Sequence, residues 1–143
     1  MSRHPPSEVV IRRLLPLLVV AVTLTLASSA QARYAPPSSY ERYMTAAAKQ
    51  FREQTYRTHP CMGRIVDREN GLWDPTLDYG GGHGNVWESY GLVQANPGTK
   101  MVSAGPLWRT DRATQLRWGI GYARTRFGSE CSAWAYWQQH NYW

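Results

Sequence analysis

Glu69 has the sequence surroundings best suited to acid–base chemistry in this 143-residue chain. It ends a helically spaced stripe whose other members are apolar: Met62, Ile65 and Val66. Burial beside these side chains and the negative end of the helix dipole both penalise an ionised carboxyl, so we expect Glu69 to hold its proton unusually well. A carboxylic acid protonated near neutral pH can donate a proton to the departing oxygen of a glycosidic bond. Pairing with a nearby arginine is the alternative for a lone glutamate on a helix.

Four segments of the chain carry a family resemblance. They are RENGLWDP at 68–75, SYGLVQANPGT at 89–99, WRTDRATQLRWGIGYARTRFG at 108–128 and AWAYW at 133–137. In this order and spacing they resemble the soluble lytic transglycosylase family, which belongs to the lysozyme-like superfamily. The resemblance implies a mainly α, lysozyme-like domain with a substrate groove and little or no β-sheet.

The resemblance also implies roles for individual residues. Glu69 corresponds to the catalytic acid and base, and Gln94 to the glutamine of the second signature. Ser89 and Tyr90 correspond to the segment that lines the cleft beside it. Tyr136 corresponds to the tyrosine that supports the glutamate.

This chain departs from the family pattern at four positions. Asn70 replaces the usual serine, Leu72 is an extra residue before the aromatic side chain, Val93 replaces methionine, and Trp137 replaces the asparagine of the closing motif. These departures concern the groups that orient the acid, so they bear on the surroundings of Glu69.

Aromatic residues are abundant in the region that lacks helical spacing. The apolar faces of sugar rings pack on tryptophan and tyrosine, so we expect substrate contacts from the aromatic residues of this region: Trp73, Trp87, Tyr90 and Trp108. Core packing is the alternative for each of them. For Trp118 and Trp134, which fall on expected helices, core packing is the favoured interpretation.

The resemblance implies cleavage of the bond between N-acetylmuramic acid and N-acetylglucosamine in peptidoglycan, with the sugar's own 6-hydroxyl closing a 1,6-anhydro ring. A hydrolytic muramidase is the first alternative, since most glycosidases use a second carboxyl group, here Asp78 or Glu88. Asp74 precedes a proline and is typical of a turn. A wall-binding protein without activity is the second alternative.

Other functional classes fit the sequence less well. His59, His83 and His140 lack the spacing of paired metal ligands, so we expect neither a metal nor a cofactor. Residues 33–143 carry 13 Lys and Arg against nine Asp and Glu, which suits an anionic partner such as a bacterial wall. The basic residues are scattered and form no stripe, which argues against nucleic acid. We expect a monomer that acts on peptidoglycan glycan strands.

These candidate residues must be positioned by a small set of helices. The spacing predicts a helix from Tyr40 to about Arg57 with Ser39 as its cap, and a second from Pro60 to a stop at Gly71. Glycine and proline predict loops, short strands or single turns over 71–109, where YGGGHGN would form a mobile rim to the groove. Helices are expected again from Thr110 or Asp111 to Gly128, and from Ser132 onward.

The N-terminus is typical of an exported protein. Three arginines, an apolar run and small residues predict a signal peptide over 1–32, followed by a flexible leader at 33–39 and the domain at 40–143. The apolar run is too short for a stable membrane anchor, which needs about 20 apolar residues. We therefore expect a secreted or wall-associated protein in which Cys61 and Cys131 form a disulfide, with two buried free thiols as the alternative.

Overall fold

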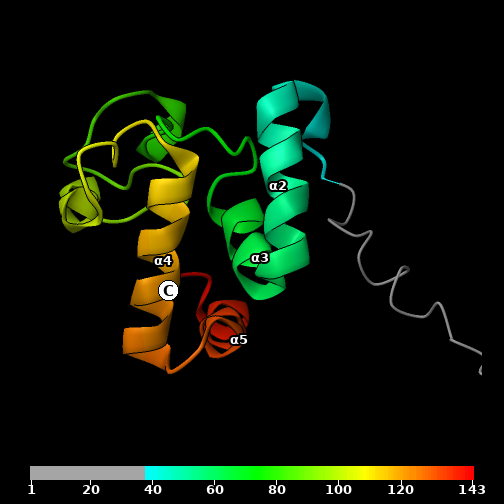
Figure 1. Cartoon of the computed structure of the whole chain (residues 1–143), viewed down its shortest axis with the longest axis vertical. Helices are drawn as coiled ribbons and strands as arrows, with labels where there is room; N and C mark the ends of the chain where they lie inside the picture. Colours follow the sequence, from blue (N-terminus) through cyan, green and yellow to red (C-terminus); the bar gives the residue numbers. More distant parts are fainter. Residues whose placement is uncertain (1–37) are drawn as a thin grey trace, which may run out of the picture.

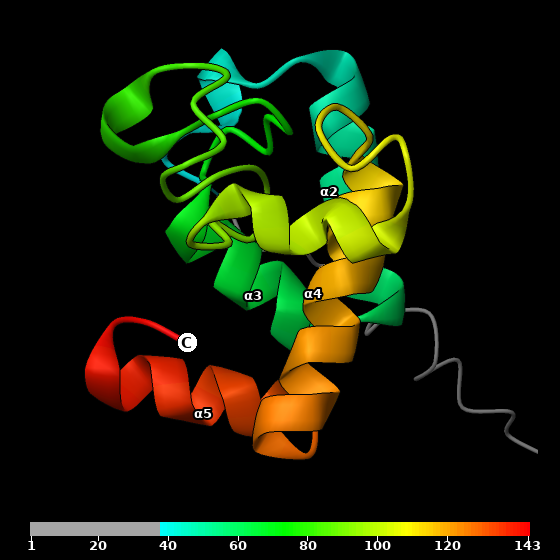
Figure 2. The ribbon, with the colours of Figure 1, turned by 90° about the vertical axis from the view of Figure 1, so that its left-hand side faces the viewer.

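The computed structural model describes residues 38–143. The predicted signal peptide and nearly all of the predicted leader lie outside the described residues. The described part is mainly helical, as predicted, and its long helices are α2 (Ala46–Thr58), α3 (Pro60–Glu69), α4 (Arg112–Phe127) and α5 (Glu130–His140). In Figure 1, α2 and α3 lie side by side to one side of α4. In Figure 2, α5 lies across one end of this group, and the chain after it turns back over the helix.

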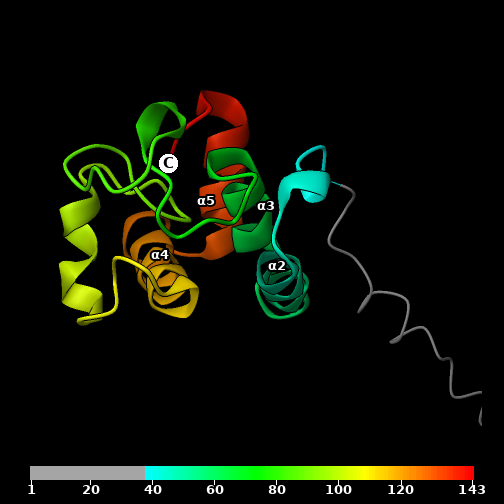
Figure 3. The same ribbon diagram turned by 90° about the horizontal axis from the view of Figure 1, so that it is seen from above.

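The region between α3 and α4 consists of loops, as the glycines and prolines predict. Within residues 38–143 it contains the 3-10 turns η2 (Tyr79–Gly81) and η3 (Gly98–Ala104) and isolated β-bridges, but no extended strand. Figure 3 shows these loops on the opposite side of the molecule from α2. No helix among the described residues is long and apolar enough to cross a membrane.

The first predicted helix starts later than expected. A 3-10 turn, η1 (Glu41–Tyr43), is followed by extended backbone at Met44, and α2 begins only after Thr45. The Thr45 hydroxyl accepts a hydrogen bond from the Ala48 amide at 3.1 Å, so Thr45 caps the helix in place of the predicted Ser39.

The buried face of α2 is polar. Its buried residues are Ala48, Arg52, Thr55 and Tyr56, whereas Tyr40 and Tyr43, which precede α2, are exposed. The reason is a carboxylate on the neighbouring helix that draws polar side chains inward, as described below.

The helix that carries Glu69 forms as predicted over most of its length. Pro60 occupies the first turn of α3, and Met62, Ile65 and Val66 are completely buried. The helix ends at Glu69, two residues before the predicted glycine, because Asn70 leaves helical geometry with φ −148° and ψ 79°. Its side chain then bonds to the following loop, which fixes the point where the helix stops.

The last two helices are defined by side-chain caps. The Asp111 carboxylate accepts from the hydroxyl and from the amide of Thr114, at 2.7 Å each. These two bonds lower the pKa of Asp111. Gly128, with φ 82°, ends α4 in the left-handed conformation that glycine adopts without strain. Ser129 caps α5 by accepting from the Ser132 amide, so α5 begins two residues before the predicted start.

The predicted disulfide between Cys61 and Cys131 is present and joins the first turns of α3 and α5. An ionic cluster lies beside it, in which Glu130 contacts His59 at 2.9 Å and Arg124 at 2.8 Å. The disulfide closes a separation of 70 residues. It therefore holds α3, which carries Glu69, against α5, although the two helices are far apart in the sequence.

Asp67 is the polar centre of the helix pair α2 and α3. Its carboxylate accepts two hydrogen bonds from Arg52, at 2.7 and 2.6 Å, one from the Tyr56 hydroxyl at 2.7 Å, and one from the Trp73 indole at 2.8 Å. The Arg52 side chain is 5% exposed. Burial, and then the bond to Asp67, raise the pKa of Tyr56, so this phenol remains a donor. One carboxylate thus ties α2, α3 and the loop after α3 together.

Replacing this carboxylate is expected to destabilise the protein. Asp67→Asn removes the negative charge that a nearly buried guanidinium faces, so the free energy of unfolding should fall by about 3 kcal/mol. The measurement is urea unfolding at neutral pH with the disulfide intact. Glu53→Gln is the matched control, since it removes the exposed ion pair with Arg57 and should cost less than about 1 kcal/mol. Equal losses in both variants would contradict the role given to Asp67.

Candidate active site

Glu69 is the last residue of α3 and is partly buried. The indole nitrogen of Trp137, on α5, donates a hydrogen bond of 2.6 Å to Oε1 of Glu69. Burial raises the pKa of Glu69 above its ordinary value of 4.5, and the indole donor offsets part of this effect because it stabilises the ionised form. The carboxyl therefore holds its proton to a higher pH than a solvated glutamate.

No arginine neutralises this carboxyl. Among the ion pairs formed within residues 38–143, none includes Glu69. The guanidinium of Arg68 instead lies 5.7 Å from the ring centre of Trp137. Glu69 is thus a weak acid with one neutral hydrogen-bond donor, which is an arrangement that can give up a proton and take one back.

The residue that supports Glu69 is Trp137, and the predicted role of Tyr136 is not what the structure shows. The Tyr136 hydroxyl donates to Tyr142 at 3.0 Å, and its ring stacks on His140 with centroids 3.9 Å apart. Consecutive residues on a helix point in different directions, so only one of the two can face α3. The closing motif was found in the sequence, but the rotation of α5 about its axis decides which aromatic residue reaches the acid.

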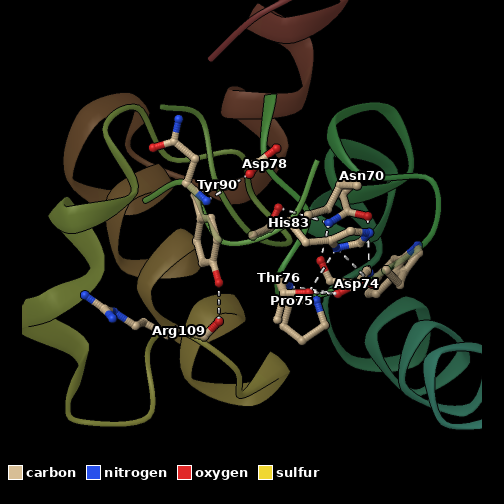
Figure 4. A network of polar contacts seen from close by, with 12 residues as sticks. Asn70, Asp74, Pro75, Thr76, Asp78, His83, Tyr90 and Arg109 are labelled. Atoms are coloured by element: carbon tan, nitrogen blue, oxygen red, sulfur yellow. Dashed lines mark hydrogen bonds and ion pairs between the residues drawn. The ribbon is translucent and has the colours of Figure 1, made fainter. Parts of the chain in front are cut away.

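Asn70 anchors the chain directly after Glu69. Its side-chain nitrogen donates to the carbonyl of Asp74 at 2.6 Å and to that of Gly91 at 3.0 Å, and its oxygen accepts from the Asp74 amide. Figure 4 shows Asn70 facing the turn that contains Asp74 and Pro75. A serine at this position would be too short to carry all three bonds, so the departure at residue 70 has a structural reason.

Gln94 also donates a hydrogen bond to the Gly91 carbonyl. Its side-chain nitrogen donates to Gly91 at 2.9 Å and to Leu77 at 3.2 Å, and its backbone adopts a left-handed φ of 46°. Because Asn70 and Gln94 share the Gly91 carbonyl, the fold brings the first and second signatures into contact.

Gln115 is a structural residue that the sequence analysis missed. It is completely buried on α4, and its oxygen accepts from the Leu92 amide at 2.8 Å. Its nitrogen donates to the carbonyls of Pro75 at 2.7 Å and Trp108 at 2.8 Å. Gly91, at φ 76°, passes so close that a Cβ there would lie 2.5 Å from the Gln115 amide oxygen. The apolar spacing of this helix does not single out Gln115, so local sequence carries no signal for its role.

Three of the four aromatic residues predicted to contact substrate are buried. Trp73 is 0%, Tyr90 2% and Trp108 7% exposed, so their rings have no free face for a sugar. The Trp73 indole donates to Asp67. Tyr90 donates to the carbonyl of Arg109 at 2.8 Å, as Figure 4 shows. These three residues therefore belong to the core, which is the alternative stated for each of them.

The other predicted contact residues remain accessible. Trp87 is 76% exposed, and Ser89 beside it is partly exposed. Trp118 and Trp134 are partly buried and pack against the core. Of the predicted aromatic surface, only the ring of Trp87 therefore keeps a face that a large ligand could reach.

A cavity of about 200 Å³ lies next to Gln94. Its walls combine amides, cations and rings: Gln94, Asn96, Lys100, Arg126, Trp118, Tyr122 and Trp143. Trp118 and Tyr122 are stacked with centroids 5.2 Å apart, and Trp143 stands edge-on to Tyr122 at 5.3 Å. Such walls offer both flat apolar faces and hydrogen-bonding groups to a polar ring.

The candidate second carboxylates have distinct surroundings. Asp74 forms the predicted turn, since Oδ1 accepts from the amide and hydroxyl of Thr76 at 2.8 Å each. Asp78, a candidate second carboxyl group, is buried, and it holds the glycine-rich loop by accepting from the Asn85 amide at 2.8 Å. Glu88 is exposed. Figure 4 shows Asp74 and Asp78 within this loop network.

Comparisons with known proteins add no assignment. No family model matches the chain, and neither a curated protein nor a solved structure matches it. Among residues 38–143, no three His, Cys, Asp or Glu side chains are grouped as metal ligands would be. The geometry around Glu69 and the sequence signatures are therefore the features that point to a function.

The raised pKa of Glu69 predicts a pH-dependent change in stability. Folding favours the protonated carboxyl, so Glu69 contributes fully to the stability of the wild type below pH 4.5. This contribution is lost as the pH rises through the folded-state pKa. Glu69→Gln removes the titration and keeps an acceptor for Trp137. Its stability relative to wild type should therefore increase as the pH is raised, as measured by urea unfolding at several pH values. Glu88→Gln, at an exposed site, should show no such trend.

Proposed function

We propose that this protein is a peptidoglycan lytic transglycosylase with a lysozyme-like fold. It would cleave the β-1,4 bond between N-acetylmuramic acid and N-acetylglucosamine and leave a 1,6-anhydro end. The observation that carries the proposal is the state of Glu69, a partly buried carboxyl with a raised pKa that, among the described residues, has a single indole donor and no cation paired to it. The four signatures in their order support it.

In the first step Glu69 acts as an acid. Its proton passes to the glycosidic oxygen as the bond from that oxygen to the muramyl carbon breaks, and the glucosamine part leaves as an alcohol. The muramyl carbon gains oxocarbenium character, and Glu69 becomes a carboxylate. The Trp137 N–H then stabilises the new charge through its bond to Oε1.

In the second step Glu69 acts as a base. The carboxylate takes the proton of the sugar's own 6-hydroxyl, whose oxygen attacks the muramyl carbon and closes the anhydro ring. The reacting hydroxyl belongs to the same sugar, so proximity replaces a positioned water and a second carboxyl. The proton balance restores the protonated Glu69 for the next cycle.

The surroundings of the acid favour this route over hydrolysis. Of the three other candidate carboxylates, Asp74 and Asp78 are engaged in loop hydrogen bonds. Glu88 is the remaining one and is exposed. A muramidase would use Asp78 or Glu88 to position a water, so the two reactions make different demands on the second carboxyl group.

The proposal places the glycan beside Glu69 and along the second signature. Gln94 lines the cavity described above, and Trp87 and Ser89 are accessible on the same loop. The aromatic and amide walls suit sugar rings with acetamido groups. The disulfide fits a protein that acts outside the cytosol, where such bonds persist, and we propose that it is secreted.

Glu69→Gln is the direct test of the reaction. The variant keeps the size of the side chain but cannot give or take the proton, so release of soluble fragments from purified peptidoglycan should fall by at least about 100-fold. Glu88→Gln is the matched control and should keep near wild-type activity. Mass spectrometry of the wild-type products should show 1,6-anhydro ends.

Each other result points elsewhere. Near-normal release by Glu69→Gln would refute the proposed role of the acid. Reducing ends together with loss of activity in Glu88→Gln would identify a muramidase. Sedimentation with peptidoglycan without any released fragment would identify a wall-binding protein.

Trp137→Phe should change the pH dependence of the reaction. The indole N–H lowers the pKa of Glu69 because it stabilises the carboxylate, so its removal raises that pKa further. Activity falls when Glu69 loses its proton, and the alkaline limb of the pH–rate profile should therefore move to higher pH in the variant. A purely structural role of Trp137 would lower the rate by the same factor at every pH and leave the limb in place.

A further inference from the structure

A separate cleft lies beside α3, the helix that carries Glu69. It has a volume of about 520 Å³ and is lined by Arg64 and Arg68 of α3, Trp134 of α5, Tyr56 of α2 and residues 38–40. The proposed mechanism gives these arginines no role, although Arg68 begins the first signature segment.

The cleft has an excess of positive charge. Arg64 and Arg68 are exposed, and neither takes part in an ion pair formed within residues 38–143. Asp67 also lines the cleft, but its carboxylate already accepts four hydrogen bonds from Arg52, Tyr56 and Trp73. The two guanidinium groups are therefore available to an anion from outside.

The wall of the cleft is connected to Glu69. Trp134 stacks on Trp137 with ring centroids 5.6 Å apart and an interplanar angle of 15°, and Arg68 lies over the Trp137 ring. The same Trp137 donates to Glu69. A ligand that engages Arg68 and covers Trp134 must change the surroundings of the Trp137 indole.

The spacing of the arginines selects the ligand. Residues four apart on a helix have side chains about 5–6 Å apart, and each guanidinium can hold one carboxylate through two hydrogen bonds. In an extended peptide, side chains on alternate residues point the same way and are about 6.6 Å apart. We propose that this cleft binds an extended acidic peptide segment with carboxylates on alternate residues, its backbone lying against Trp134.

Two capped pentapeptides test the spacing directly on the purified full chain. Ala-Glu-Ala-Glu-Ala should shift the indole N–H signals of Trp134 and Trp137 in ¹H–¹⁵N spectra and bind more tightly than Ala-Glu-Ala-Ala-Ala by about tenfold, since it gains one charged pair. Equal affinities of the two peptides would overturn the proposal. Inorganic phosphate should compete only weakly, and full displacement at equal concentration would show a site for a single anion and overturn the peptide assignment.

Arginine variants test the location. Arg64→Gln combined with Arg68→Gln should weaken binding of the diacidic peptide by about tenfold or more for each arginine. Arg57→Gln combined with Arg109→Gln makes the same change of charge at exposed sites outside the cleft and should leave binding within twofold. An equal loss in both double variants would show general charge attraction and contradict the site. None of these readouts requires glycan cleavage, so the cleft and the proposed function can fail separately.

Discussion

The carboxylate of Asp67 is the interaction on which the positions of α2, α3 and the following loop depend. A charge in this place is tolerated because Arg52, Tyr56 and Trp73 supply four hydrogen bonds to its two oxygens. The donors come from α2 and from the loop after α3, whereas Asp67 itself lies on α3. Without Asp67 these buried donors would lose the acceptor that they share. Formation of the helix pair is therefore coupled to formation of the loop.

Two carboxyl groups on α3 show how surroundings divide structural from chemical roles. Asp67 and Glu69 are two residues apart and therefore point to nearly opposite sides of the helix. Asp67 accepts four bonds, including two from a guanidinium, whereas Glu69 accepts one from a neutral indole. The first stabilises the fold through these four bonds. Burial raises the pKa of the second, which favours the transfer of its proton.

Buried amides replace a sheet as the framework of the loop region. Asn70 and Gln94 converge on the Gly91 carbonyl, and Gln115 bonds three separate loop segments from α4. An amide has donors and an acceptor on one planar group, so a single side chain can satisfy several backbone groups that regular structure would otherwise pair. This framework places the second signature against the residue that follows Glu69 and keeps the glycine-rich loop beside it.

Local patterns in the sequence were enough to predict the apolar stripe ending at Glu69, the caps and glycine stop of α4, the loops between the helices and the disulfide, because each depends on neighbouring residues or on a simple pairing. Only the tertiary structure decided that Trp137 rather than Tyr136 reaches Glu69, that Arg52 faces inward, and that Trp73, Tyr90 and Trp108 are buried. These outcomes depend on how each helix is rotated about its axis and on which distant groups supply hydrogen bonds. Helical spacing defines a face but carries no information about what that face will meet.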